Sequence, residues 1–136
     1  MQRLQNRPQF QATLAGPVIA KTMHFALHRN SLDAQSTPET PSDVLHVAKL
    51  FATHDVWIGA MAPKRWAKRA VTRNSIKRQI YSVSADFAAH LPVAAFVVRL
   101  RRTFDRKAFP SATSEALRQA VRMEIQLLMA AATRLS

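Results

Sequence analysis

The spacing of apolar residues predicts two long helices, each with one apolar side. One stripe consists of Ile76, Ile80, Val83 and Phe87, inside a stretch bounded by Pro63 and Pro92 that has no internal proline or glycine. The other consists of Leu117, Val121, Ile125, Leu128 and Ala132, within residues 111–132. A stripe at this spacing lets a helix bury one side against a sheet. Glu115 falls in the first turn of the second helix, where the helix dipole favours an acid.

Alternating residues predict strands. In residues 56–62 one face holds Ile58, Ala60 and Ala62, and the other holds Trp57, Gly59 and Met61. Residues 93–102 place Phe96, Val98 and Leu100 opposite Val97, Arg99 and Arg101. Residues 18–28 are rich in strand formers and predict a third strand, whereas residues 44–53 fit either a strand or a helix, and we favour a strand.

The remaining segments predict a short helix and a loop. Phe10 and Leu14 lie one turn apart after Pro8, and Gly16-Pro17 ends the segment. Residues 30–43 are rich in Ser, Thr and Pro and predict a mobile loop. The resulting order is αββ(β)αβα, an α+β fold in which helices pack on one sheet as a two-layer α-β sandwich. With 136 residues the chain suits a single domain, residues 1–136.

Composition indicates a class of partner for this fold, because the charge is strongly unbalanced. The chain has 20 Lys and Arg against 8 Asp and Glu, a formal net charge of +12, which favours binding to a polyanion. It contains no cysteine, which excludes disulfides and thiolate metal sites. No apolar run approaches the length of about 20 residues that a membrane span needs. We therefore expect a soluble, cytoplasmic protein.

The positive charge is concentrated between residues 56 and 85, a segment without any acid. Its cations are Lys64, Arg65, Lys68, Arg69, Arg73, Lys77 and Arg78, and Asn74 lies beside them. On a helix, the cations from residue 69 onward would form rows beside the apolar stripe, so one helix could pack on the sheet and bind phosphates. A merely solvated helix face is the alternative, but such faces mix signs because like charges repel. A smaller cluster, Arg99, Arg101, Arg102, Arg106 and Lys107, predicts a second basic surface.

Catalytic motifs are missing from the sequence. Two glycines, Gly16 and Gly59, cannot form a phosphate-binding or dinucleotide-binding loop. The five histidines are scattered, and His24 and His28 are spaced for a metal only on a helix, where we predict a strand. We therefore expect no metal bound by the protein alone and no catalytic side chains. Phe10 and Phe25 fit either the core, which spacing alone favours, or a surface on which unpaired bases stack.

The segment Ala70-Val71-Thr72-Arg73-Asn74-Ser75-Ile76-Lys77-Arg78 resembles the Arg-Asn-Arg signature helix of the protein subunit of bacterial ribonuclease P. The preceding Ile58-Gly59 and Pro63-Lys64-Arg65, and the following Leu91-Pro92 turn and strand, match that family in order and spacing. The similarity runs from about residue 57 to 129, with a weaker echo at Phe10, Leu14 and residues 24–28. Three positions depart from the family: Ser75 replaces the second signature Arg, Pro63 replaces a small residue, and His28 stands where an aromatic residue is common.

The resemblance implies both fold and function. The fold would join parallel strands through the signature helix in a left-handed crossover, an exception to the usual right-handed rule. The enzyme would be a tRNA-processing endoribonuclease whose catalytic component is RNA, with Mg²⁺ held mainly by that RNA. The protein would bind the catalytic RNA and the single-stranded five-prime leader of precursor tRNA. Contacts to the catalytic RNA would come from Lys64, Arg65, Lys68, Arg69, Arg73, Asn74, Lys77 and Arg78, and the leader cleft from Phe10, Leu14, Phe25 and His28.

Two alternatives remain open at the level of sequence. A non-enzymatic basic module, such as a ribosomal protein or an RNA chaperone, could use the same cationic helix. A helix that reads DNA through Asn74 is a weaker fit, because no second helix precedes the basic one closely enough. We therefore expect RNA partners, with neither DNA nor a membrane among them.

Overall fold

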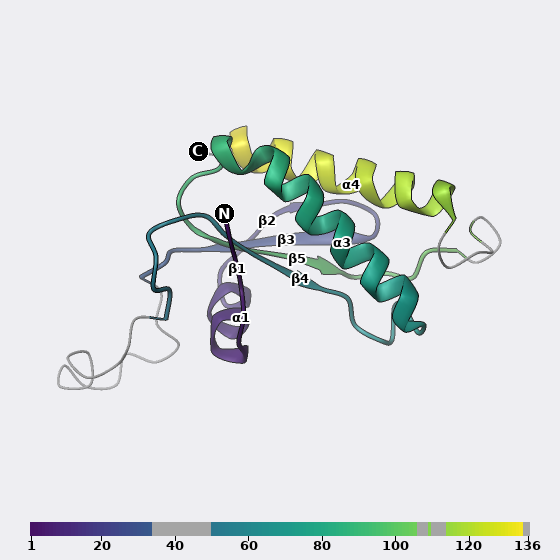
Figure 1. The fold of residues 1–136 in the computed structure, drawn as a ribbon, viewed down its shortest axis with the longest axis horizontal. Helices are drawn as coiled ribbons and strands as arrows, with labels where there is room; N and C mark the ends of the chain where they lie inside the picture. The colour runs from purple at the N-terminus through teal and green to yellow at the C-terminus, as the bar shows by residue number, and fades with distance from the viewer. Residues whose placement is uncertain (34–49, 106–108, 110–113, 135–136) are drawn as a thin grey trace.

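A mixed sheet forms the centre of the molecule (Figure 1). The computed structural model describes residues 1–33, 50–105, 109 and 114–134. Five strands pair in the order β1-β4-β5-β3-β2. They are β1 (Gln2–Arg3), β2 (Val18–Lys21), β3 (Phe25–Asn30), β4 (Trp57–Met61) and β5 (Ala95–Leu100). β4 is parallel to β1 and β5, whereas β3 is antiparallel to β5 and β2.

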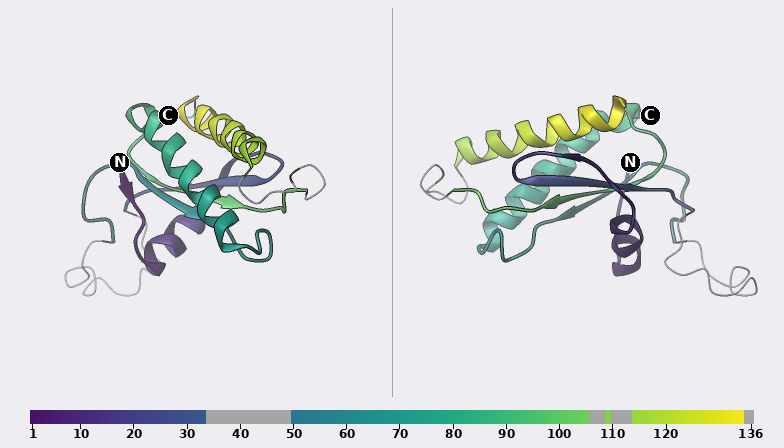
Figure 2. Two further views of the ribbon diagram at one scale, coloured as in Figure 1. Left: turned by 45° about the vertical axis from the view of Figure 1, so that its right-hand side comes forward. Right: turned by 180° about the vertical axis from the view of Figure 1, so that it is seen from behind.

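Helices lie on both faces of the sheet. The long helices α3 (Ala70–Phe87) and α4 (Glu115–Arg134) cross one face side by side, and the short α1 (Arg7–Leu14) lies against the other (Figures 1 and 2). A 3₁₀ turn, η1 (Ala88–His90), ends α3. α3 links the adjacent parallel strands β4 and β5. No helix in the described ranges is both long and apolar enough to cross a bilayer.

The alternation predicted from sequence divides the core between these two faces. The larger core lies under α3 and α4 and contains Ile58, Ala60 and Ala62 of the β4 segment with Phe96, Val98 and Leu100 of β5. Both predicted helical stripes face it. The smaller core lies on the α1 side and contains Leu4, Phe51, Trp57, Ala95 and Val97. The α+β sandwich is therefore confirmed, with α1 as a partial layer on the second face.

Two parts of the predicted sheet were wrong. Residues 18–28 form two strands rather than one, because the chain turns at residues 22–24 and the Thr22 amide donates to the Phe25 carbonyl oxygen at 2.9 Å. The guanidinium of Arg101 holds this turn from another strand, with Nη2 2.8 Å from the Thr22 carbonyl oxygen. β1 was not predicted at all. Most of the predicted loop 30–43 and strand 44–53 lies outside the described residues.

Candidate nucleic-acid interface

The basic block forms one surface at the start of α3. After β4 the loop 62–69 carries Lys64, Arg65, Lys68 and Arg69 to the amino-terminal end of the helix, which then adds the remaining cations. The exposed members are Lys64, Arg65, Lys68, Arg69, Asn74 and Arg78, while Arg73 and Lys77 are half-buried. The helix therefore buries its apolar stripe and presents cations on the other side, as its sequence predicts.

No carboxylate neutralises this surface within the part of the chain that the structure describes. The ion pairs found there join His24 to Glu124, Arg118 to Glu115, Arg122 to Asp86, and the terminal amino group to Asp55. All of them lie outside residues 64–78. An unpaired cluster of cations attracts polyanions and releases their counterions on binding. The surface therefore has the electrostatic character that RNA binding requires.

Arg73 differs from its neighbours because it contacts the protein itself. Its Nη1 donates to the carbonyl oxygens of Ala67 at 3.0 Å and Lys68 at 2.8 Å. These bonds fasten the loop 62–69 to the first turns of α3 and so hold the exposed cations of the loop in place. The resemblance implies that Arg73 contacts the catalytic RNA, and the structure shows that one of its nitrogens, Nη1, is bonded to the backbone.

Trp66 anchors the same loop in the core. Its ring packs against the larger core, and the guanidinium carbon of Arg65 lies 5.3 Å from the ring centroid. The indole Nε1 is buried and has no hydrogen-bond partner. The sequence reasoning assigned Trp66 no role, although an aromatic residue within a run of cations is a sign of such an anchor.

The predicted leader cleft corresponds to the α1 side of the sheet. Asn6 caps α1, its Oδ1 accepting from the Gln9 amide at 3.0 Å. Phe10 and Leu14 are half-buried and pack against the smaller core. Gly59 of β4 faces them, because an added Cβ there would stand only 2.7 Å from Cε1 of Phe10. Phe10 and Leu14 therefore lie between the sheet and solvent, with part of each side chain accessible.

His28 shares this side of the sheet but is not an open stacking platform. It is 8% exposed; its Nδ1 lies 3.3 Å from the Gly16 carbonyl oxygen, and its Nε2 accepts from Nε of Arg99 at 3.3 Å. Burial, with a further contribution from the Arg99 charge, lowers the pKa of His28. The ring therefore positions Arg99, and a role of His28 in lining the leader cleft stays a prediction.

Phe25 lies on the opposite face, away from the α1 side on which the predicted cleft lies. The side chain is 0% exposed and packs in the larger core, 6.0 Å from the ring of Phe104. Side chains alternate along a strand, so Phe25 and His28, three residues apart, must face opposite sides. Of the four predicted cleft residues, only Phe10 and Leu14 remain accessible on the α1 side.

Two members of the second basic cluster make contacts within the protein. Arg99 donates to His28, and Arg101 donates twice to the Thr22 carbonyl oxygen. Arg106 and Lys107 lie outside the described residues, and Arg102 is exposed. These contacts show that two of the predicted cations mainly organise the sheet, which periodicity alone could not reveal.

Comparison with known proteins gives a consistent family. A family model described as Ribonuclease P matches residues 1–124. The ribonuclease P protein component of Paraburkholderia xenovorans (strain LB400) is 36% identical over 77 residues, which make up 57% of this chain and 55% of that protein. Its counterpart in Burkholderia mallei (strain SAVP1) is 36% identical over 80 residues, 59% of each chain. The chain thus spans little more than half the length of these curated relatives.

A solved structure shares the fold. The RNase P protein of Staphylococcus aureus superposes with a TM-score of 0.63, covering 96% of this chain and 94% of its own, at 15% sequence identity. At that identity the likeness concerns the arrangement of helices and strands. The sheet with α3 and α4 on one face and α1 on the other is therefore an arrangement already known from experiment.

Proposed function

The chain belongs to the ribonuclease P protein family, and we propose that it acts as the protein subunit of ribonuclease P. In this role it binds the catalytic RNA and the single-stranded leader of precursor tRNA, and assists Mg²⁺-dependent removal of that five-prime leader. The observation that carries the proposal is the surface of residues 64–78, whose cations are exposed or half-buried and have no carboxylate partner among the described residues. Its place on the signature helix of the matched family supports catalytic RNA as the ligand.

The protein contributes electrostatics rather than reacting groups. Folding an RNA brings phosphates together, and a fixed array of guanidinium and ammonium groups reduces their repulsion. Residues 64–69 approach RNA as one unit, because Arg73 and Trp66 hold their loop. Among the described residues no group of three or more His, Asp or Glu side chains could hold a metal ion. In this proposal the RNA would hold the Mg²⁺ that cleavage requires.

The leader lies on the other side of the sheet in this proposal. Phe10 and Leu14 supply a partly exposed apolar edge on which unpaired bases can stack or pack. Arg99, half-buried beside them and oriented by His28, supplies a cation for a leader phosphate. The two RNAs would then contact opposite faces of one sheet, so that the protein bridges them.

Reconstitution with the catalytic RNA and labelled precursor tRNA tests this function. We expect the protein to raise cleavage at low Mg²⁺ concentration and to cleave nothing alone. Replacing both Arg69 and Lys77 with Gln should flatten the slope of log binding constant against log salt by about 1 to 2 units, at roughly 0.7 to 0.9 per phosphate contact. Lys21→Gln is the control, because it also removes one positive charge but lies on β2, at the opposite edge of the sheet from β1.

The result also separates the alternative of a non-enzymatic RNA-binding module. A protein that binds RNA with the expected salt dependence but leaves cleavage unchanged at every Mg²⁺ concentration belongs to that alternative. A salt slope that is the same in the double variant and in the parent would remove α3 from the RNA interface and with it the basis of the proposal.

A further inference from the structure

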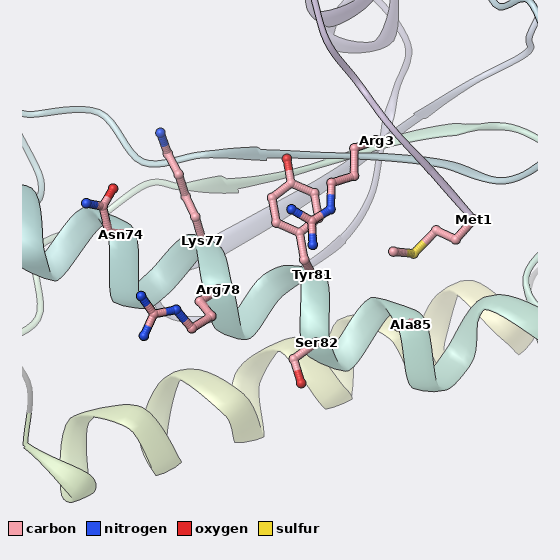
Figure 3. A pocket seen from close by; sticks show the side chains of 8 residues that line it. All are labelled: Met1, Arg3, Asn74, Lys77, Arg78, Tyr81, Ser82 and Ala85. Carbon is pink, nitrogen blue, oxygen red and sulfur yellow. The ribbon is translucent and has the colours of Figure 1, made fainter.

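A hollow lies between the amino-terminal strand and the outer face of α3 (Figure 3). It has a volume of about 460 Å³ and opens to solvent. The residues that matter here are Arg3, Asn74, Lys77, Arg78, Tyr81 and Ser82. Lys77, Arg78 and Asn74 belong to the basic surface already described, whereas Arg3 and Tyr81 were assigned no role from the sequence. The hollow therefore extends that surface onto the edge of the sheet.

The charges around the hollow are positive. Arg3, Lys77 and Arg78 have no ion-pair partner among the described residues, and no acid lines the hollow. The carboxylates on the adjoining elements are already paired: Asp55 binds the terminal amino group at 3.2 Å, and Asp86 binds Arg122 at 3.2 Å. Three cations around an open hollow favour an anion as the ligand.

Arg3 is held in a defined position by its surroundings. Backbone bonds on either side of it, from the Gln2 amide to Val56 at 2.8 Å and from the Leu4 amide to Ile58 at 2.9 Å, fix β1 against β4. Its guanidinium lies over the ring of Tyr81, 4.1 Å from the centroid. A guanidinium stacked on a ring keeps the N–H groups at its edge free to donate, in a geometry that matches a phosphate.

The Tyr81 ring is itself fixed. Its hydroxyl accepts from the Ala60 amide of β4 at 3.3 Å, so the ring bridges α3 and the sheet beneath Arg3. Asn74 and Ser82 add neutral donors at the rim, and Nη1 of Arg122 lies 3.4 Å from Oγ of Ser82. The hollow is thus organised before any ligand arrives, which reduces the entropy lost on binding.

We propose that this hollow binds a backbone phosphate of RNA, with Arg3, Lys77 and Arg78 as its ligands and Tyr81 as the residue that positions Arg3. The inference rests on the proposed function and deepens it by adding a phosphate site outside the signature helix. An RNA strand is favoured over a small free anion because Lys77 and Arg78 belong to the hollow and to the basic surface at once. A strand that follows α3 therefore enters the hollow without leaving the protein.

The test compares Arg3→Gln with Lys21→Gln in two arms. One arm measures binding of the catalytic RNA of the same organism, and the other measures binding of precursor tRNA to the reconstituted holoenzyme, each across a range of salt. Arg3→Gln should flatten the salt slope by about 0.7 to 0.9 and weaken binding roughly fivefold at 0.1 M salt. The arm in which this occurs identifies which RNA supplies the phosphate. Lys21→Gln, on an exposed edge strand at the other side of the sheet, should leave both slopes unchanged.

Variants of Tyr81 test its positioning role. Tyr81→Phe keeps the ring under Arg3 but loses its bond to the Ala60 amide, so it should bind RNA more tightly than Tyr81→Leu. Tyr81→Leu should weaken binding about two- to fivefold through loss of the cation-π contact. Thermal melting confirms that each variant is folded. If Arg3→Gln changes neither arm more than Lys21→Gln does, the phosphate site is refuted. If the parent protein itself fails to bind or activate the catalytic RNA, it is the proposed function that fails.

Discussion

Adding one methyl group at Gly59 should loosen α1 from the sheet and leave the basic surface intact. A Cβ at this position would stand 2.6 Å from Cδ1 of Leu4 and 2.7 Å from Cε1 of Phe10. Comfortable contact between carbon atoms needs about 3.5 to 4.0 Å. Both side chains must therefore retreat by roughly 1 Å, and Phe10 carries α1 with it.

The expected loss of stability combines two opposing effects. Overpacking of this kind costs about 1 to 3 kcal/mol. Gly59 does not have a positive φ, so alanine fits its backbone conformation, and the stiffer unfolded chain returns about 0.4 to 1 kcal/mol. The difference leaves Gly59→Ala roughly 0.5 to 2 kcal/mol less stable, a fall in Tm of about 2 to 8 °C for a chain of this size.

Calorimetry measures the stability, and cleavage of one precursor tRNA with a long leader and one with a single-nucleotide leader measures the function. The variant should discriminate less between the two substrates, while its salt slope for catalytic RNA stays at the parent value. Ile125→Val is the control. Loss of one buried methyl group should lower the free energy of unfolding by a similar amount, about 0.5 to 1.5 kcal/mol, but Ile125 lies in the larger core on the opposite face of the sheet. A Gly59→Ala protein as stable as the parent would refute the packing argument. Lost stability with unchanged discrimination would instead remove α1 from the leader site.

Three further substitutions test individual contacts. Arg73→Lys keeps the charge but shortens the reach to the two backbone carbonyls, so catalytic RNA should bind about 5- to 30-fold more weakly, on the order of 1 to 2 kcal/mol, with an unchanged salt slope. Binding as tight as that of the parent would show that these bonds do not hold the loop. The Val56 amide and the terminal amino group lower the pKa of Asp55. The parent should therefore have a higher Tm than Asp55→Asn at a pH above the ordinary pKa of Asp, and this difference should vanish as the pH falls below the lowered pKa of Asp55. A difference in Tm that persists in acid would contradict this. Burial lowers the pKa of His28, so the unfolded chain binds its proton first and stability should decline as the pH falls below about 6.5. His28→Gln should lack this part of the decline in a pH series of melting curves, and identical curves would exclude His28 as its source.

Periodicity predicted the parts of this fold that bury one clean face. All five residues of the predicted α4 stripe are buried, and Ser114, just ahead of the helix, accepts from the Leu117 amide as a cap. The β4 and β5 segments divide their side chains between the two cores as alternation requires. In these elements the local pattern and the tertiary packing favour the same conformation, so the pattern alone was sufficient.

The elements that periodicity missed depend on distant partners. β1 has only two residues, too few for any pattern, and exists because β4 offers it hydrogen bonds. The turn at residues 22–24 is held by Arg101, 79 positions further along the chain. The resemblance placed Phe25 and His28 in one cleft because it matched sequence positions without considering which face of the strand each side chain occupies. The alternation of side chains along β3 puts them on opposite faces. Arg3 could not be connected with Tyr81 before β1 was known.

The position of Ser75 explains why the hollow beside β1 matters for this chain. Ser75 stands where the family signature has its second Arg, so α3 offers one fewer guanidinium than that signature implies. It lies one turn from Gln79, whose side chain accepts from Arg122 of α4, so this flank of the helix faces α4. Arg3, in contrast, meets α3 on its β1 flank beside Lys77 and Tyr81. If the hollow binds phosphate, the path of the RNA is therefore displaced toward the edge of the sheet. Adding Ser75→Arg to the Arg3→Gln variant should recover only part of the lost RNA affinity, because the restored charge lies on the other flank of α3.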